Sequence, residues 1–115
     1  MNVRILHNPR CSKSRQTLDL LRERGLEPEI VPYLETPPSA PELREILGLL
    51  GRRPRDLLRR GEAEYRELGL ADTTLDDDVL IDAMVRHPRL IERPIVIVGG
   101  KAAVGRPPES VLEIL

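Results

Sequence analysis

The first 34 residues predict a strand, a helix and a second strand in succession, and this order restricts the possible folds more than any other feature. Apolar runs predict strands at 3–6 (VRIL) and 29–34 (EIVPYL), and helix formers dominate from Ser14 to Arg24. Because the connecting helix is too long for a tight turn, the strands are expected to be parallel and joined by a right-handed crossover. Pro32 cannot donate to a strand ladder, so the second strand is expected at a sheet edge.

The middle of the chain is predicted to be helical. Capping boxes at Ser39 and Thr74 begin two helices, and Pro54 opens a shorter helical stretch between them. Pro88 ends the last of these helices.

A hairpin and a final helix complete the predicted elements. The apolar runs 94–98 (PIVIV) and 101–104 (KAAV) flank Gly99-Gly100, a pattern typical of a two-residue β-turn. Pro107 and Pro108 begin a helix whose core side is expected to carry Val111, Leu112 and Leu115.

This order of elements predicts an α/β fold with a four-stranded mixed sheet. A cysteine at the first strand-to-helix junction makes the arrangement thioredoxin-like, with a helical insertion at about 39–88 between the βαβ and ββα halves. A length of 115 residues suits one domain, 1–115, with a single core.

Composition excludes several classes of function. The chain has no Phe or Trp, so its core is expected to be aliphatic and it offers no aromatic platform for nucleic-acid bases. A net charge of -1 gives no broad attraction to nucleic acid or to a membrane surface, and this balance is compatible with a monomer. One cysteine excludes a disulfide scaffold, and the apolar runs are too short for a membrane span or a secretory signal. We therefore expect a cytoplasmic protein.

Cys11 is the residue best suited to chemistry. At a helix N-terminus a thiol faces unpaired N–H groups and the positive end of the helix dipole, both of which favour the thiolate. Arg10, Lys13 and Arg15 add positive charge around it. Because these neighbours are polar, we expect an ionised, exposed nucleophile instead of a small buried hydrophobe.

His7 and Ser14 are candidate supporting residues. His7, four residues before Cys11, either tunes the thiolate and moves a proton or is a structural residue. Ser14 stands where a second cysteine would complete a C-x-x-C pair, and its hydroxyl either serves the thiolate or caps the helix.

Two other kinds of site are disfavoured. Cysteine phosphatases need an arginine six residues after the cysteine, and Thr17 occupies that position here. One cysteine with His7 and His87 does not make a metal-ligand set, so no metal site is expected.

Four segments closely resemble the glutaredoxin-coupled arsenate reductase family (ArsC type). They are HNPRCSKSR at 7–15, YLETPP at 33–38, RDLLRR at 55–60 and ERPIVIVGGKAAVGRPPE at 92–109, and matching segments run from residue 5 to residue 115. The resemblance implies a nucleophile at Cys11, with His7, Ser14 and Arg15 in its motif. It also implies three oxyanion-binding arginines, Arg59, Arg93 and Arg106, with Arg60 as the alternative to Arg59.

The resemblance implies reduction of arsenate to arsenite through an adduct on Cys11. Because the chain has no second cysteine, glutathione as co-substrate and glutaredoxin as partner would supply the remaining thiols, and no bound cofactor is expected. The Arg93–Pro94 bond matches the position of the cis proline of thioredoxin-like folds, so we predict that it is cis.

Two alternatives remain on the same fold. One is another glutaredoxin-like thiol oxidoreductase, which would act on mixed disulfides of glutathione. The other is a non-enzymatic regulator that resembles Spx-type proteins and binds RNA polymerase. Regulators of that type usually carry a C-x-x-C switch, and Ser14 removes it here.

Overall fold

The computed structural model describes residues 2–115, whose contacts group into two compact units. The sheet unit comprises the chain up to Thr36 together with Arg93–Leu115, and the helical unit comprises Pro37–Glu92. The helical unit encloses the insertion expected at about 39–88. The count of one domain over 1–115 stays a prediction.

The sheet unit contains one four-stranded mixed sheet in the order β2-β1-β3-β4. Its strands are β1 (Val3–Leu6), β2 (Glu29–Val31), β3 (Ile95–Val98) and β4 (Lys101–Val104). β1 pairs with β2 in parallel and with β3 antiparallel, and β3 pairs with β4 antiparallel. The predicted thioredoxin-like α/β class is therefore confirmed, and so is the edge position of the second strand. The bounds 29–34 predicted for that strand were wrong, because β2 ends at Val31 and Pro32 follows it.

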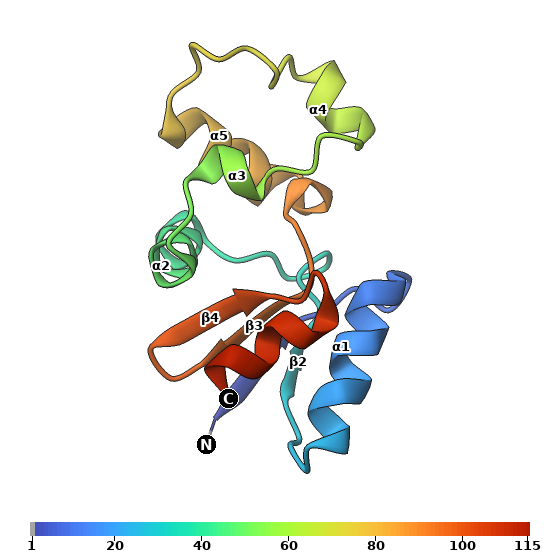
Figure 1. Ribbon diagram of the computed structural model, residues 1–115. Helices are drawn as coiled ribbons and strands as arrows, with labels where there is room; N and C mark the ends of the chain where they lie inside the picture. The colour runs from blue at the N-terminus through green and yellow to red at the C-terminus, as the bar shows by residue number, and fades with distance from the viewer. Residues whose placement is uncertain (1) are drawn as a thin grey trace. The chain divides into compact units, whose positions relative to one another are not determined.

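One face of the sheet is covered by α1 (Ser12–Glu23) and by η2 (Pro108–Ile114), which lie side by side (Figure 1). The core between the sheet and these two helices is aliphatic, as the absence of Phe and Trp predicts. It consists of Val3, Ile5, Leu18, Leu21, Val96, Val98 and Val111. Full burial of each such side chain stabilises the fold by roughly 1.5–3 kcal/mol.

The last helix differs from the prediction, because it is a 3₁₀-helix. Residues three apart lie on the same side of a 3₁₀-helix. Pro108, Val111 and Ile114 therefore point to the core, and Val111 is fully buried. Leu115, four residues after Val111, would share its side only in an α-helix and is 37% exposed, so its core placement was wrong.

The helical unit consists of α2 (Ala40–Leu50), α3 (Pro54–Leu57), α4 (Ala63–Glu67), α5 (Asp77–Arg86) and η1 (Pro88–Leu90). The capping box at Ser39 is confirmed, because Ser39 Oγ accepts from the Glu42 N–H and Glu42 Oε1 accepts from the Ser39 N–H. Gly51 ends α2 with a left-handed backbone, φ 65°. No helix within the described residues has the length and apolarity needed to cross a membrane.

The capping role predicted for Thr74 is wrong. The Thr74 hydroxyl donates to Asp72 Oδ1 at 2.6 Å, and the Thr74 N–H donates to the same oxygen at 2.9 Å. Asp76 caps α5 instead, because its Oδ1 accepts from the Val79 N–H at 3.0 Å. A local turn holds Thr74 before the helix begins, and Asp is as good a cap as Thr.

Candidate active site

Cys11 is the N-cap residue of α1, with an extended backbone of φ -93° and ψ 122°. Its N–H donates to the Asn8 carbonyl at 3.0 Å, and its own carbonyl accepts the first helical bond from the Arg15 N–H at 3.0 Å. Because Cys11 itself is the N-cap residue, no side-chain oxygen caps the helix at this position. The thiol therefore lies where the first N–H groups of the helix lack carbonyl partners.

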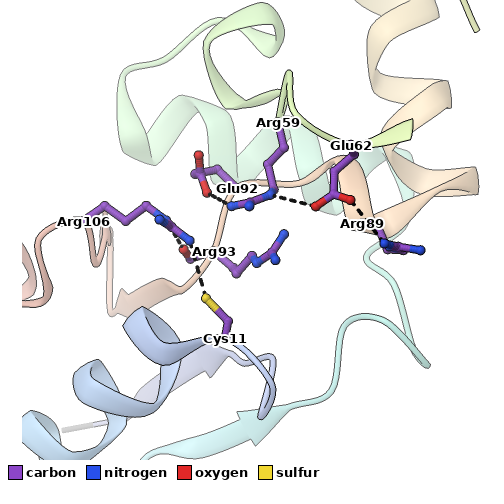
Figure 2. Close-up of polar contacts among 7 residues, drawn as sticks. All are labelled: Cys11, Arg59, Glu62, Arg89, Glu92, Arg93 and Arg106. Carbon is purple, nitrogen blue, oxygen red and sulfur yellow. Dashed lines mark hydrogen bonds and ion pairs between the residues drawn. The ribbon is translucent and has the colours of Figure 1, made fainter. Parts of the chain in front are cut away.

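The Cys11 sulfur is surrounded by hydrogen-bond donors from two distant parts of the chain. Arg106 Nη2 donates to Cys11 Sγ at 3.4 Å across 95 residues of sequence (Figure 2). Burial alone would raise the pKa of the Cys11 thiol. Hydrogen bonds from the N–H groups of Ser14 and Lys13, together with the hydrogen bond and charge of Arg93, outweigh burial and lower that pKa below its ordinary value.

The prediction of an exposed sulfur is wrong, because Cys11 is only 9% exposed. The groups that surround the sulfur are guanidinium and N–H donors. A thiol buried among aliphatic side chains would have a raised pKa, whereas these donors favour the thiolate. The low exposure therefore does not remove the donors that favour the thiolate, and the ionised state stays a prediction.

Arg93 and Arg106 are linked to each other as well as to the sulfur. Arg106 Nε donates to the Arg93 carbonyl at 2.7 Å. The Arg93–Pro94 bond is cis, as predicted, and the Arg106–Pro107 bond is also cis, which was not predicted. Of the residues that the sequence singles out, Cys11, Arg93 and Arg106 therefore converge on one point of the sheet unit.

His7 and Ser14 are bonded to each other. His7 Nδ1 and Ser14 Oγ lie 2.6 Å apart, and Ser14 Oγ also accepts from the Asn8 N–H at 3.0 Å. Burial lowers the pKa of His7, and the charges of Arg22 and Arg15 lower it further. The Nδ1 atom of a neutral His7 can accept a hydrogen bond from the Ser14 hydroxyl. The Ser14 hydroxyl therefore does not cap α1, and it is the Ser14 N–H that reaches Cys11.

Arg15 and Asn8 shape the loop before Cys11. Arg15 Nη1 donates to the Pro9 carbonyl at 2.9 Å, and Asn8 Oδ1 accepts from the Arg10 N–H at 3.0 Å. Asn8 was not among the predicted site residues, yet it is buried and makes three of the loop's hydrogen bonds. A turn-forming Asn directly before a functional loop was the available signal.

Arg59 belongs to the helical unit, where two carboxylates hold its guanidinium. Arg59 Nη1 lies 2.6 Å from Glu92 Oε1, and Arg59 Nε lies 3.3 Å from Glu62 Oε1 (Figure 2). Glu62 also pairs with Arg89 at 3.3 Å. Arg60, the alternative to Arg59, is exposed. The two glutamates were not anticipated: Glu92 begins the ArsC-like segment 92–109, but its contact with Arg59 spans 33 residues of sequence.

No group of three or more His, Cys, Asp or Glu side chains within residues 2–115 is arranged to hold a metal ion. The chemistry of the sheet unit instead centres on one sulfur, two guanidinium groups and two backbone N–H groups. Such a set stabilises a thiolate and can bind the oxygens of a tetrahedral anion.

The fold and the site define a thioredoxin-like protein whose single thiol lies among cationic groups. The model of the ArsC family matches residues 6–114, and the chain belongs to this family.

The chain is similar over almost its whole length to several known proteins. It is 59% identical to a protein of Escherichia coli strain K12 named "Uncharacterized protein YfgD", over 98% of this chain and 96% of the relative. It is 51% identical to an "Arsenate reductase" of Neisseria meningitidis serogroup B, over 98% and 97% of the two chains. A solved structure named "Arsenate reductase from Vibrio cholerae" superposes with a TM-score of 0.97 at 53% identity, covering 100% of this chain and 98% of that one.

Proposed function

We propose that this protein is an arsenate reductase that uses Cys11 as its nucleophile. The observation that carries the proposal is the Cys11 sulfur at the start of α1, hydrogen-bonded by Arg106 Nη2 at 3.4 Å and by Arg93. Two relatives named "Arsenate reductase", with 51% and 48% sequence identity to this chain, support arsenate as the substrate. Arsenate is a tetrahedral oxyanion, and guanidinium groups match its oxygens in pairs.

In the first step the Cys11 thiolate attacks the arsenic atom. A sulfur–arsenic bond forms, one arsenic–oxygen bond breaks, and the oxygen leaves as water after protonation. Arsenic stays pentavalent in this adduct. Arg93 and Arg106 neutralise charge on the arsenate oxygens and lower the repulsion between two anions.

Reduction then needs two electrons that the chain's single cysteine does not supply. Glutathione first displaces an oxygen of the adduct, which leaves as water, so that a second sulfur–arsenic bond forms. The glutaredoxin thiolate then attacks the glutathione sulfur. A sulfur–sulfur bond forms, the bond from arsenic to the glutathione sulfur breaks, and its electron pair stays on arsenic, which becomes trivalent. Water finally replaces Cys11 on arsenic, so that arsenite departs and the Cys11 thiolate is restored after loss of a proton. The protein needs no bound cofactor for this cycle, and glutathione is a co-substrate.

His7, Ser14 and Arg15 act as supporting residues in this proposal. Ser14 links His7 to the loop through the Asn8 N–H, and Arg15 holds the Pro9 carbonyl. A neutral His7 adds no charge that would compete with the arginines for the anion. The three residues therefore keep the loop before Cys11 in one conformation.

Arg59 is proposed as the third oxyanion-binding residue. Glu62 and Glu92 restrict its side chain, which is 23% exposed. A guanidinium has five N–H donors, so the ion pairs that Arg59 makes through Nε and Nη1 leave further N–H donors for an anion.

Glutaredoxin is the proposed protein partner. The protein is proposed to work as a cytoplasmic monomer, with no role for nucleic acid or membrane.

A coupled assay tests the function. NADPH oxidation is followed in the presence of glutathione, glutathione reductase and glutaredoxin, with and without arsenate. We expect oxidation that depends on arsenate and that is lost in Cys11→Ser. Folded wild-type protein without arsenate-dependent turnover would contradict the proposal. Reduction of a glutathione mixed disulfide would then support the glutaredoxin-like alternative, and capture of RNA polymerase would support the regulator.

A further inference from the structure

We propose that Gly105 is a positioning residue of the thiol site, because its missing side chain lets the end of β4 pack directly on Thr17 and Pro94. This packing brings Arg106, the next residue, to the Cys11 sulfur. Its importance for catalysis rests on the proposed function, but its effect on the thiol does not. The test therefore measures the pKa of the Cys11 thiol, which does not depend on arsenate. A failure of this inference is thus distinguishable from a failure of the arsenate proposal.

The space around Gly105 is too small for any side chain. A Cβ added at this position would lie 2.5 Å from Thr17 Oγ1, 2.8 Å from Pro94 Cγ and 3.1 Å from Thr17 Cγ2. All three separations are well inside the ordinary contact distance between heavy atoms. Every other glycine within the described residues has open space at its Cβ position.

The neighbours of Gly105 have little freedom to move away. Thr17 is fully buried, and its hydroxyl donates to the Lys13 carbonyl at 2.8 Å in the first turn of α1. Pro94 is a ring fixed between Arg93 and β3, and its carbonyl accepts from the Gly105 N–H at 2.9 Å. A side chain at 105 would therefore push α1 and the Arg93–Pro94 segment away from the end of β4.

Those two segments supply the groups that stabilise the thiolate. α1 carries Cys11 and the N–H groups of Lys13 and Ser14, and the other segment carries Arg93. Arg106 bridges them, with Nε on the Arg93 carbonyl and Nη2 on Cys11 Sγ. The Arg106–sulfur distance is 3.4 Å, so a shift of about an ångström breaks this bond.

The decisive variant is Gly105→Ala, and its matched control is Gly100→Ala. Gly100 lies in the same hairpin, has open space at its Cβ position and does not have a positive φ. The chain has one cysteine, so the rate of iodoacetamide alkylation of thiol against pH reports on Cys11 alone. We expect Gly105→Ala to raise the thiol pKa by roughly one unit, and Gly100→Ala to leave it unchanged.

A merely structural role would lower the melting temperature of Gly105→Ala without moving its thiol pKa, and that result overturns the proposal. If Gly105→Ala does not fold, the double variant Thr17→Ala/Gly105→Ala is compared with Thr17→Ala. The double variant lacks two of the three close atoms but keeps the Pro94 contact at 2.8 Å. A higher thiol pKa in the double variant supports the proposal, and equal values overturn it.

Discussion

At the scale of single residues, Arg106 combines two hydrogen bonds, one to the Cys11 sulfur and one to the Arg93 carbonyl. Lys has one compact charge and cannot make both bonds in this planar geometry. We expect Arg106→Ala to raise the thiol pKa by about one unit and Arg106→Lys to raise it less. The pH dependence of alkylation measures both. Arg24→Ala, at the far end of α1, is the control, and an unchanged pKa in Arg106→Ala would exclude the role.

A second prediction at this scale concerns His7. Its folded-state pKa is lowered by burial and by Arg22 and Arg15, whereas in the unfolded chain it is about 6.5. Between these two values the unfolded state binds more protons, so His7 makes the free energy of unfolding rise with pH up to about 6.5 and adds no slope above it. Urea denaturation of wild type and His7→Gln at several pH values measures this. Equal slopes in both proteins below that pH would contradict the assignment.

At the scale of elements, the start of α5 separates a true cap from a residue that only resembles one. Asp76 accepts from the Val79 N–H, whereas Thr74 bonds to Asp72 before the helix. Asp76→Ala is expected to lower the free energy of unfolding by about 1 kcal/mol. Thr74→Ala should lower it less, since it removes only a bond within an exposed turn. Equal losses in urea denaturation would favour the Thr74 cap instead.

Local signals predicted elements well, because strand alternation, capping residues and turn glycines act within a few residues. The sheet, the edge position of β2, the Ser39 capping box and the cis Arg93–Pro94 bond followed from such signals or from the family resemblance. The C-terminal 3₁₀-helix did not, because this short segment has apolar pairs both three apart (Val111 and Ile114) and four apart (Val111 and Leu115), so its pattern does not distinguish the two helix types.

The site was predictable in its residue types but not in its contacts. The bond from Arg106 to Cys11 spans 95 residues, and the bond from Arg59 to Glu92 spans 33. Contacts of this kind form only when the folded chain brings distant segments together, and a sequence pattern of a few residues does not predict them. The low exposure of Cys11 has the same origin, because distant arginines reach the sulfur.

At the scale of the whole molecule, the proposed function assigns one reaction to residues of two compact units. The sheet unit contains Cys11, Arg93 and Arg106, and the helical unit contains Arg59 with its two glutamates. Arg93 lowers the pKa of the Cys11 thiol and Arg106 donates to its sulfur, whereas the guanidinium of Arg59 is paired with Glu62 and Glu92. Stabilisation of the thiolate and binding of the anion are therefore separable by mutation.

This separation gives the last prediction. Arg59→Ala should lower kcat/KM for arsenate by roughly tenfold, the loss of one charge-assisted bond, and leave the thiol pKa unchanged. Arg93→Ala should lower kcat/KM and also raise the thiol pKa, because it removes a hydrogen bond and a charge from the sulfur. The coupled assay and the alkylation profile measure the two effects independently.

Arg60→Ala removes the exposed guanidinium of the next residue in the sequence and is the matched control. If Arg60→Ala lowers kcat/KM and Arg59→Ala does not, the third oxyanion-binding residue is Arg60, and the ion pairs of Arg59 with Glu62 and Glu92 are purely structural.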